Sequence, residues 1–129
     1  MTVVEYGKEI DKPGFYCPKR HRETWVMWIS DIYRCYEIEN QKGICVQLCD
    51  QVLLHQMTAA GVVQCRVAAC ISLVSKAAGL CFELKELVEL GDGAFSLDDL
   101  IEAEFFVIGV ITFLNGWSLL TQTMKISNK

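Results

Sequence analysis

One stretch constrains the fold of this chain more than any other: QCRVAACISLVSKAAGL, residues 64–80. Its small and apolar residues fall on nearly every side of a helix, and Gly79 stands where a C-terminal cap would end that helix. A helix that is apolar all round has to be covered by other elements. The stretch therefore predicts a central helix that runs from an N-cap at Thr58 to about Ala78.

Four further segments carry helical signals. In HRETWVMWISDIYRCYEI, residues 21–38, apolar residues recur every three or four positions. Asn40 is the expected N-cap of a second helix, FELKELVEL at 82–90 forms a short one, and Ser96 caps a last one that ends near Asn115. The apolar set of the second helix is Ile44, Leu48, Val52 and Leu53. Together these segments predict an all-α, five-helix bundle with the apolar third helix at its centre.

The 129 residues suffice for one compact domain. Glycines and prolines punctuate residues 1–19, which we expect to form an N-terminal arm pinned by Phe15 and Tyr16. We expect the folded domain at 20–115 and a C-terminal tail at 116–129.

The charge is acidic and unevenly spread. The formal net charge is −4, and the segment from Phe82 to Glu104 holds eight acids and only one base, Lys85. This sign repels phosphate, which disfavours nucleic acid as a partner and suits a basic protein surface. A plain solvated surface is the alternative interpretation.

Seven cysteines are present, and no two of them have C-x-x-C spacing. Five sit inside apolar segments and are expected to be buried thiols in a reducing compartment, the cytoplasm or the nucleus. These are Cys45, Cys49, Cys65, Cys70 and Cys81. Neither histidine lies at ligand spacing from two cysteines, so we predict no metal site, and we predict no cofactor.

No catalytic or membrane signal emerges. Ser72 and Ser75 lack a histidine with a third group, and GDG at 91–93 is a turn rather than a phosphate loop, so we predict that the chain is not an enzyme. The run FFVIGVITFL has ten residues, about half a bilayer span. It predicts a buried helix and no membrane partner.

The order of these helices and several fixed residues resemble the cyclin box, the five-helix N-terminal fold of cyclins. The resemblance covers about residues 22–115. Its matching positions are Arg22 and Trp28 in RETWVMWISDI, Asp50 in DQVL, Lys76 in LVSK and Glu104 in AEFFVIGVITF.

The resemblance pairs Arg22 with Asp50. A guanidinium that faces a carboxylate bidentately would tie the first helix to the second. Removing one member of such a half-buried pair would cost about 3–5 kcal/mol. The alternative is that each side chain is simply exposed.

The resemblance also implies a kinase-binding face. In cyclins, the residues equivalent to Lys76 and Glu104 contact the mobile C-helix of a cyclin-dependent kinase, and apolar neighbours, here Ala77 and Ile108, fill the interface. The alternative is a surface pair worth under about 1 kcal/mol. Ala77 stands where the family has a bulky aromatic residue, which removes an expected anchor.

A second family site is a shallow apolar groove that docks Arg-x-Leu peptides. The matching positions are His21, Trp25, Trp28, Asp31 and Gln64. Asp31 would receive the peptide arginine and Trp28 the leucine, whereas His21 and Trp25 replace a methionine and a leucine and change the shape of the groove. The alternative is core packing for Trp28 and a solvated Asp31.

Arg66 departs from the family, which is usually apolar at this position of the central helix. An arginine there has to find a carboxylate or reach solvent.

We therefore expect a cyclin-like regulatory subunit that binds and activates a cyclin-dependent serine/threonine kinase by positioning its C-helix. The alternative is a cyclin-fold adaptor that activates nothing, which the missing aromatic and the lack of a second five-helix repeat favour. The DNA-binding relatives of this fold are disfavoured by the acidic charge.

Overall fold

Five α-helices make up most of residues 12–80 and 83–114, the part of the chain that the computed structural model describes. The helices are α2 (Pro18–Cys35), α3 (Lys42–Leu54), α4 (Val63–Ala77), α5 (Leu84–Leu90) and α6 (Leu97–Leu114). Two 3₁₀ turns, η1 (Glu39–Gln41) and η2 (Ala60–Val62), precede α3 and α4. The predicted all-α class is confirmed, and the described residues contain no strand beyond an isolated bridge between Phe15 and Ala59.

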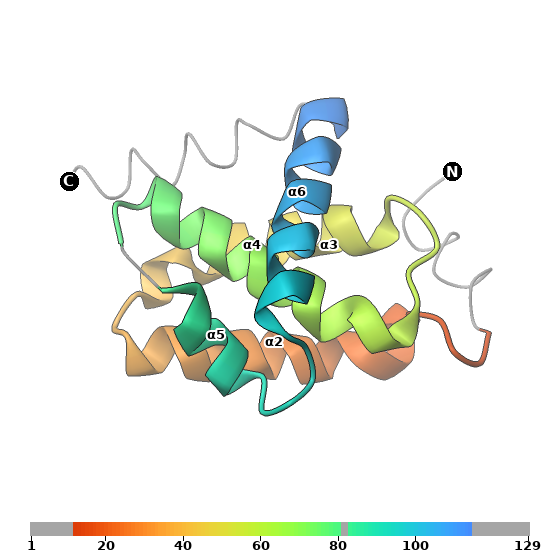
Figure 1. Cartoon of the computed structure of the whole chain (residues 1–129), viewed down its shortest axis with the longest axis horizontal. Coiled ribbons are helices and arrows are strands. Elements are labelled where there is room, and N and C mark those ends of the chain that lie inside the picture. Colours follow the sequence, from red (N-terminus) through yellow and green to blue (C-terminus); the bar gives the residue numbers. More distant parts are fainter. Residues whose placement is uncertain (1–11, 81–82, 115–129) are drawn as a thin grey trace.

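Helix α4 occupies the centre of the bundle, as its composition predicts. It contacts each of the other four described helices, and ten of its fifteen residues are buried. Figure 1 shows it crossing the middle of the molecule, with α6 in front and α2 along the lower edge. By length and composition Ala60–Ala77 could cross a membrane, but 56% of that stretch is buried inside the protein. Cover by the other helices accounts for its apolar character.

A Schellman motif ends α4, which confirms Gly79 as the residue after the C-cap. Gly79 has a φ of +81°, and its amide donates to the Lys76 carbonyl while the Leu80 amide donates to the Ser75 carbonyl. Only a residue without a Cβ adopts this φ freely. The turn fixes Lys76 in the last helical turn, at the surface.

Two predicted N-caps are wrong. Asn40 lies within η1 and makes no capping hydrogen bond. Helix α3 begins two residues later, at Lys42. The Thr58 hydroxyl lies 3.1 Å from the Leu53 carbonyl oxygen and bonds backward to α3. Both helices are preceded by a 3₁₀ turn that satisfies part of the backbone without a side-chain cap.

Helix α2 is displaced from the predicted span by three residues. It begins at Pro18, a residue type well suited to the first helical position, and the Cys17 amide donates to Nδ1 of His21 at 2.9 Å. It ends before Glu37, whose φ of 59° leaves the right-handed helical region. Ahead of it Tyr16 is 2% exposed and accepts a hydrogen bond from the Trp25 indole at 3.0 Å.

The start of α6 confirms the predicted cap. The Asp99 amide donates to the Ser96 hydroxyl at 3.1 Å, and the Ser96 amide donates back to Asp99 Oδ2 at 3.0 Å. This reciprocal capping box satisfies two backbone donors at the helix start.

The other core predictions hold in part. The run FFVIGVITFL was predicted to be a buried helix, but only one side of it is buried: Val107 and Val110 lie in the core, whereas Phe105 and Phe113 are 71% and 76% exposed. The apolar set of α3 is buried, and so are Cys45, Cys49, Cys65 and Cys70 as free thiols. In α5, Leu87 is buried, whereas Leu90, the last residue of this short helix, is 40% exposed. Cys81, Phe82 and Asn115 lie outside the described residues.

Candidate functional site

A bidentate ion pair joins α2 to α3. Arg22 donates from Nε and Nη2 to the two Asp50 carboxylate oxygens, each at 2.9 Å. The hydrogen bond to Asp50 raises the pKa of Arg22. The side chains are 43% and 31% exposed. Water therefore screens the pair, and the cost of about 3–5 kcal/mol that applies to a buried pair is too high for this one.

A second charged pair joins the end of α4 to α6. Lys76 Nζ lies 2.9 Å from Glu104 Oε2, and the buried Ser72 hydroxyl donates to the same oxygen at 2.9 Å. Glu104 is only 12% exposed, whereas Lys76 is 53% exposed. The buried Ser72 hydroxyl thus fixes the Glu104 carboxylate. The carboxylate in turn positions the Lys76 ammonium group, which has three donors, at the surface.

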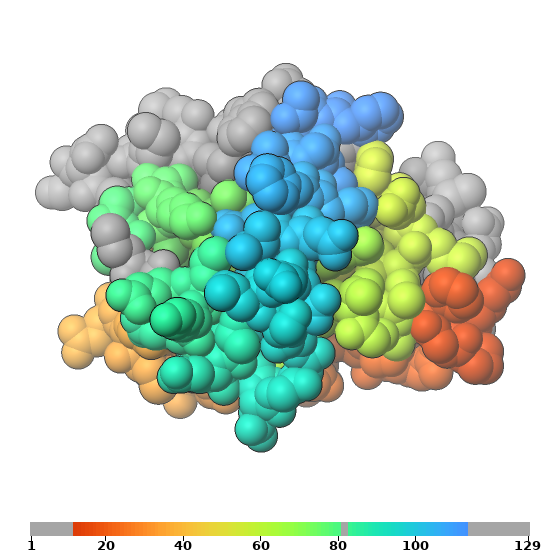
Figure 2. All heavy atoms as spheres, in the orientation of Figure 1, coloured from red at the N-terminus to blue at the C-terminus, as the bar shows by residue number. Residues whose placement is uncertain are grey.

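Apolar side chains on α6 extend the surface around this pair. Ile108, which the resemblance singled out, is 37% exposed, and Ala77 is partly buried against the core. Two residues that the sequence analysis missed, Ile101 and Phe105, are 38% and 71% exposed. Figure 2 shows α6 lying open on this side of the molecule.

We name the ion pair together with Ile101, Phe105 and Ile108 the Lys76–Glu104 face. The positions 101, 105 and 108 repeat at helical spacing, a signal that was available in the sequence. Exposed apolar side chains grouped around a preformed charged pair are typical of a protein-binding surface.

The five residues predicted for the peptide groove line one pocket. It has a volume of about 480 Å³ between α2 and the start of α4, and we name it the Trp28 groove. The predicted residues in it are His21, Trp25, Trp28, Asp31 and Gln64. Trp25 is 3% exposed and belongs to the core as well, whereas Asp31 is largely exposed and lies 3.3 Å from Arg34.

Comparison with known families agrees with this geometry. A family model described as the N-terminal domain of cyclins matches residues 10–114. The chain belongs to the cyclin family. The match covers the helices that carry the Arg22–Asp50 pair, the Lys76–Glu104 face and the Trp28 groove. A search of curated proteins and a search of solved structures each gave no match.

The family assignment fixes the broad class of the protein. Cyclins are a family of regulatory proteins rather than catalysts. Within residues 12–80 and 83–114, no three His, Cys, Asp or Glu side chains are grouped to hold a metal ion.

Proposed function

We propose that this cyclin binds a cyclin-dependent serine/threonine kinase through the Lys76–Glu104 face and activates it. The observation that carries the proposal is the fork in which Ser72 and Lys76 both bond to the Glu104 carboxylate. Because the fork is already formed in the isolated chain, binding would require little ordering of these side chains.

Activation follows from differential binding. Phosphoryl transfer by a protein kinase needs an ion pair between a lysine of its sheet and a glutamate of its C-helix. A partner that binds the inward position of that helix more tightly than the outward one shifts the population toward the active arrangement. The cyclin supplies the difference in binding energy, and the kinase carries out the chemistry.

Two elements of the face have different roles in this proposal. Lys76 is half exposed and its ammonium has three donors, so it would bond to backbone or side-chain oxygens of the kinase. Phe105 and Ile108 would supply the apolar area around that contact. A kinase partner places the proposed site of action in the cytoplasm or the nucleus.

The alternative proposal is an adaptor that binds without activating. It is favoured by one observation: the segment after Lys76 is Ala77, Ala78 and then the Gly79 turn, which offers no large side chain to the kinase. For either role, the Trp28 groove is proposed to hold Arg-x-Leu peptides of substrates or inhibitors, with Asp31 facing the peptide arginine.

An activity assay on an identified complex separates the two proposals. The tagged chain is purified from its source cells, the kinase that co-purifies is identified by mass spectrometry, and both proteins are then made recombinantly. An activating cyclin raises phosphorylation of a Ser/Thr peptide by the recombinant kinase in proportion to complex formed. A complex that forms without a rise in activity supports the adaptor, and no kinase among the partners contradicts both proposals.

A further inference from the structure

Arg66 is the charged residue of α4 that the kinase proposal leaves unexplained. Its guanidinium carbon lies 3.8 Å from the centroid of the Phe106 ring, and Nη1 donates to the Thr58 hydroxyl at 3.2 Å. No ion pair links it to a carboxylate among the residues that the structure describes. Burial lowers the pKa of Arg66. A half-buried guanidinium thus has one face covered by a ring and most of its donors left over.

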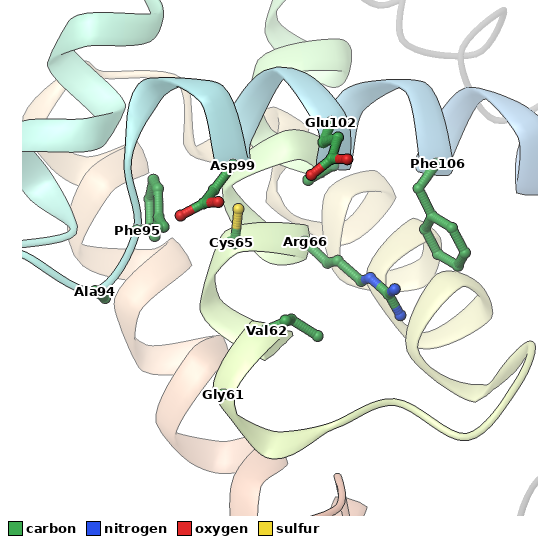
Figure 3. Close-up of a pocket in the computed structure, with 10 residues that line it drawn as sticks. Gly61, Val62, Cys65, Arg66, Ala94, Phe95, Asp99, Glu102 and Phe106 are labelled. Carbon is green, nitrogen blue, oxygen red and sulfur yellow. The ribbon is translucent and has the colours of Figure 1, made fainter.

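These donors line a pocket of about 430 Å³ where α4 and α6 begin. Figure 3 shows the Arg66 guanidinium beneath Phe106 on one side, and Asp99 and Glu102 along α6. The rest of the lining is largely apolar and includes Val62, Cys65, Phe95 and Ala103, with Cys65 between Asp99 and Arg66 (Figure 3). Burial raises the pKa of Cys65 to about 11, so its thiol is protonated and uncharged at neutral pH.

The two carboxylates differ in how they are held. Asp99 accepts the Ser96 amide with one oxygen, which fixes its orientation, and that hydrogen bond lowers its pKa. Glu102 is exposed at the rim. Asp99 is therefore ionised at neutral pH. The pocket carries one positive group on α4 and two negative groups on α6, with apolar surface between them.

This pocket is separate from the Trp28 groove. The turn η2 and the first turn of α4 divide them, since Ala60, Val63 and Gln64 line the groove, whereas Val62 and Cys65 line the pocket. A ligand of one site need not touch the residues that line the other.

We propose that the Arg66 pocket binds a partner peptide segment that carries an acidic and a basic side chain around an apolar residue. The acidic side chain bonds bidentately to the edge of the Arg66 guanidinium. The basic one lies against Asp99 and Glu102, and the apolar residue covers Val62, Phe95 and Cys65. Charge complementarity selects this occupant: a purely anionic ligand meets two carboxylates, and a purely apolar one buries an unpaired guanidinium.

The test uses the full chain labelled with ¹⁵N and a panel of end-capped peptides. Each peptide carries Lys and Glu separated by one, two or three leucines, and both orders are included. Each peptide also has a control peptide, its Gln partner, in which Glu is replaced by Gln. We expect one mixed-charge peptide to shift the Arg66 Nε–H signal and the amides of residues 61–66 and 94–103 together. Its Gln partner should bind at least about tenfold more weakly, because a charge-assisted contact is lost.

Three variants make the result specific. Arg66→Gln should weaken the best peptide about as much as the Gln peptide does, and Arg66→Lys should weaken it less because the charge remains. Asp31→Asn, in the Trp28 groove, should leave the affinity unchanged. The proposal is overturned if no peptide shifts these signals, if the shifts survive Arg66→Gln, or if inorganic phosphate shifts them as strongly.

Discussion

Arg22 and Asp50 are the pair whose coupling is best defined at the residue scale. We predict that a double-mutant cycle of Arg22→Gln and Asp50→Asn gives a coupling free energy of about 1–2 kcal/mol. Two hydrogen bonds of 2.9 Å favour the upper value, and exposures of 43% and 31% lower it. Urea unfolding of the four proteins measures the coupling. A coupling free energy near zero would show that the ion pair does not contribute to stability.

Tyr16 makes stability depend on alkaline pH. Burial raises its pKa from 10.0 to about 12, so the folded state holds the proton more tightly than the unfolded chain does. This contribution is complete below pH 10 and is lost as the pH rises from about 10 to about 12, a fall of about 2 kcal/mol.

We predict that Tyr16→Phe loses less unfolding free energy between pH 9 and pH 12 than the wild type does. Burial also raises the pKa of Tyr33, so part of the alkaline loss remains in the variant. Urea unfolding at a series of pH values measures both slopes. Identical slopes in the two proteins would contradict the assignment to Tyr16.

The sequence could predict the side chains that stand at recognisable family positions. It could not predict contacts that depend on how two helices cross in space. Lys76 and Glu104 stand at positions marked by the cyclin resemblance, and the structure brings them to 2.9 Å. Ser72 was missed as a partner of Glu104, although it lies one turn before Lys76 on the same side of α4. The stacking of Arg66 on Phe106 follows from how α4 crosses α6, which no local spacing contains.

At the scale of elements, helix existence was predictable and several helix starts were not. The Ser96 cap was correct because it and Asp99 satisfy each other within four residues of sequence. Thr58 is the same kind of cap residue, but Gly61 stands three positions after it, where Asp99 follows Ser96, and the Thr58 hydroxyl bonds to the Leu53 carbonyl. A single cap residue such as Thr58 or Asn40 therefore did not locate a helix start, whereas the Ser96–Asp99 pair did.

The turn between α5 and α6 requires a glycine at position 91, because the Phe95 ring packs against it. A Cβ at this position would lie 2.6 Å from Cε1 of Phe95, whose side chain is buried. We predict that Gly91→Ala lowers the free energy of unfolding by about 1–3 kcal/mol. Gly109→Ala is the matched control, because its Cβ meets nothing within 4 Å in the middle of α6.

The control variant should be more stable than the wild type by about 0.5–1 kcal/mol, since alanine is the better helix former. Thermal unfolding of both variants checks that Gly91→Ala lowers stability and that Gly109→Ala raises it. Equal effects of the two substitutions would mean that the Phe95 ring moves aside at little cost.

At the scale of the whole molecule, the apolar character of α4 determines where function can lie. Because the other helices cover most of its length, α4 presents its last turn at the surface and places Lys76 beside Glu104. The same cover leaves α6 with one side on the core and Phe105 on the outside. The proposed kinase face, the Trp28 groove and the Arg66 pocket are three separate surfaces around this one central helix.

The binding affinity of the purified chain for its identified cyclin-dependent kinase tests this account most directly. We predict that Lys76→Glu and Glu104→Lys each weaken binding at least about tenfold, because each removes the fork and adds a repulsive charge at the interface. Arg34→Glu makes the same charge change as Lys76→Glu at an exposed site on α2 and should alter affinity less than about twofold. Equal affinity of all four proteins would contradict the assignment of the Lys76–Glu104 face.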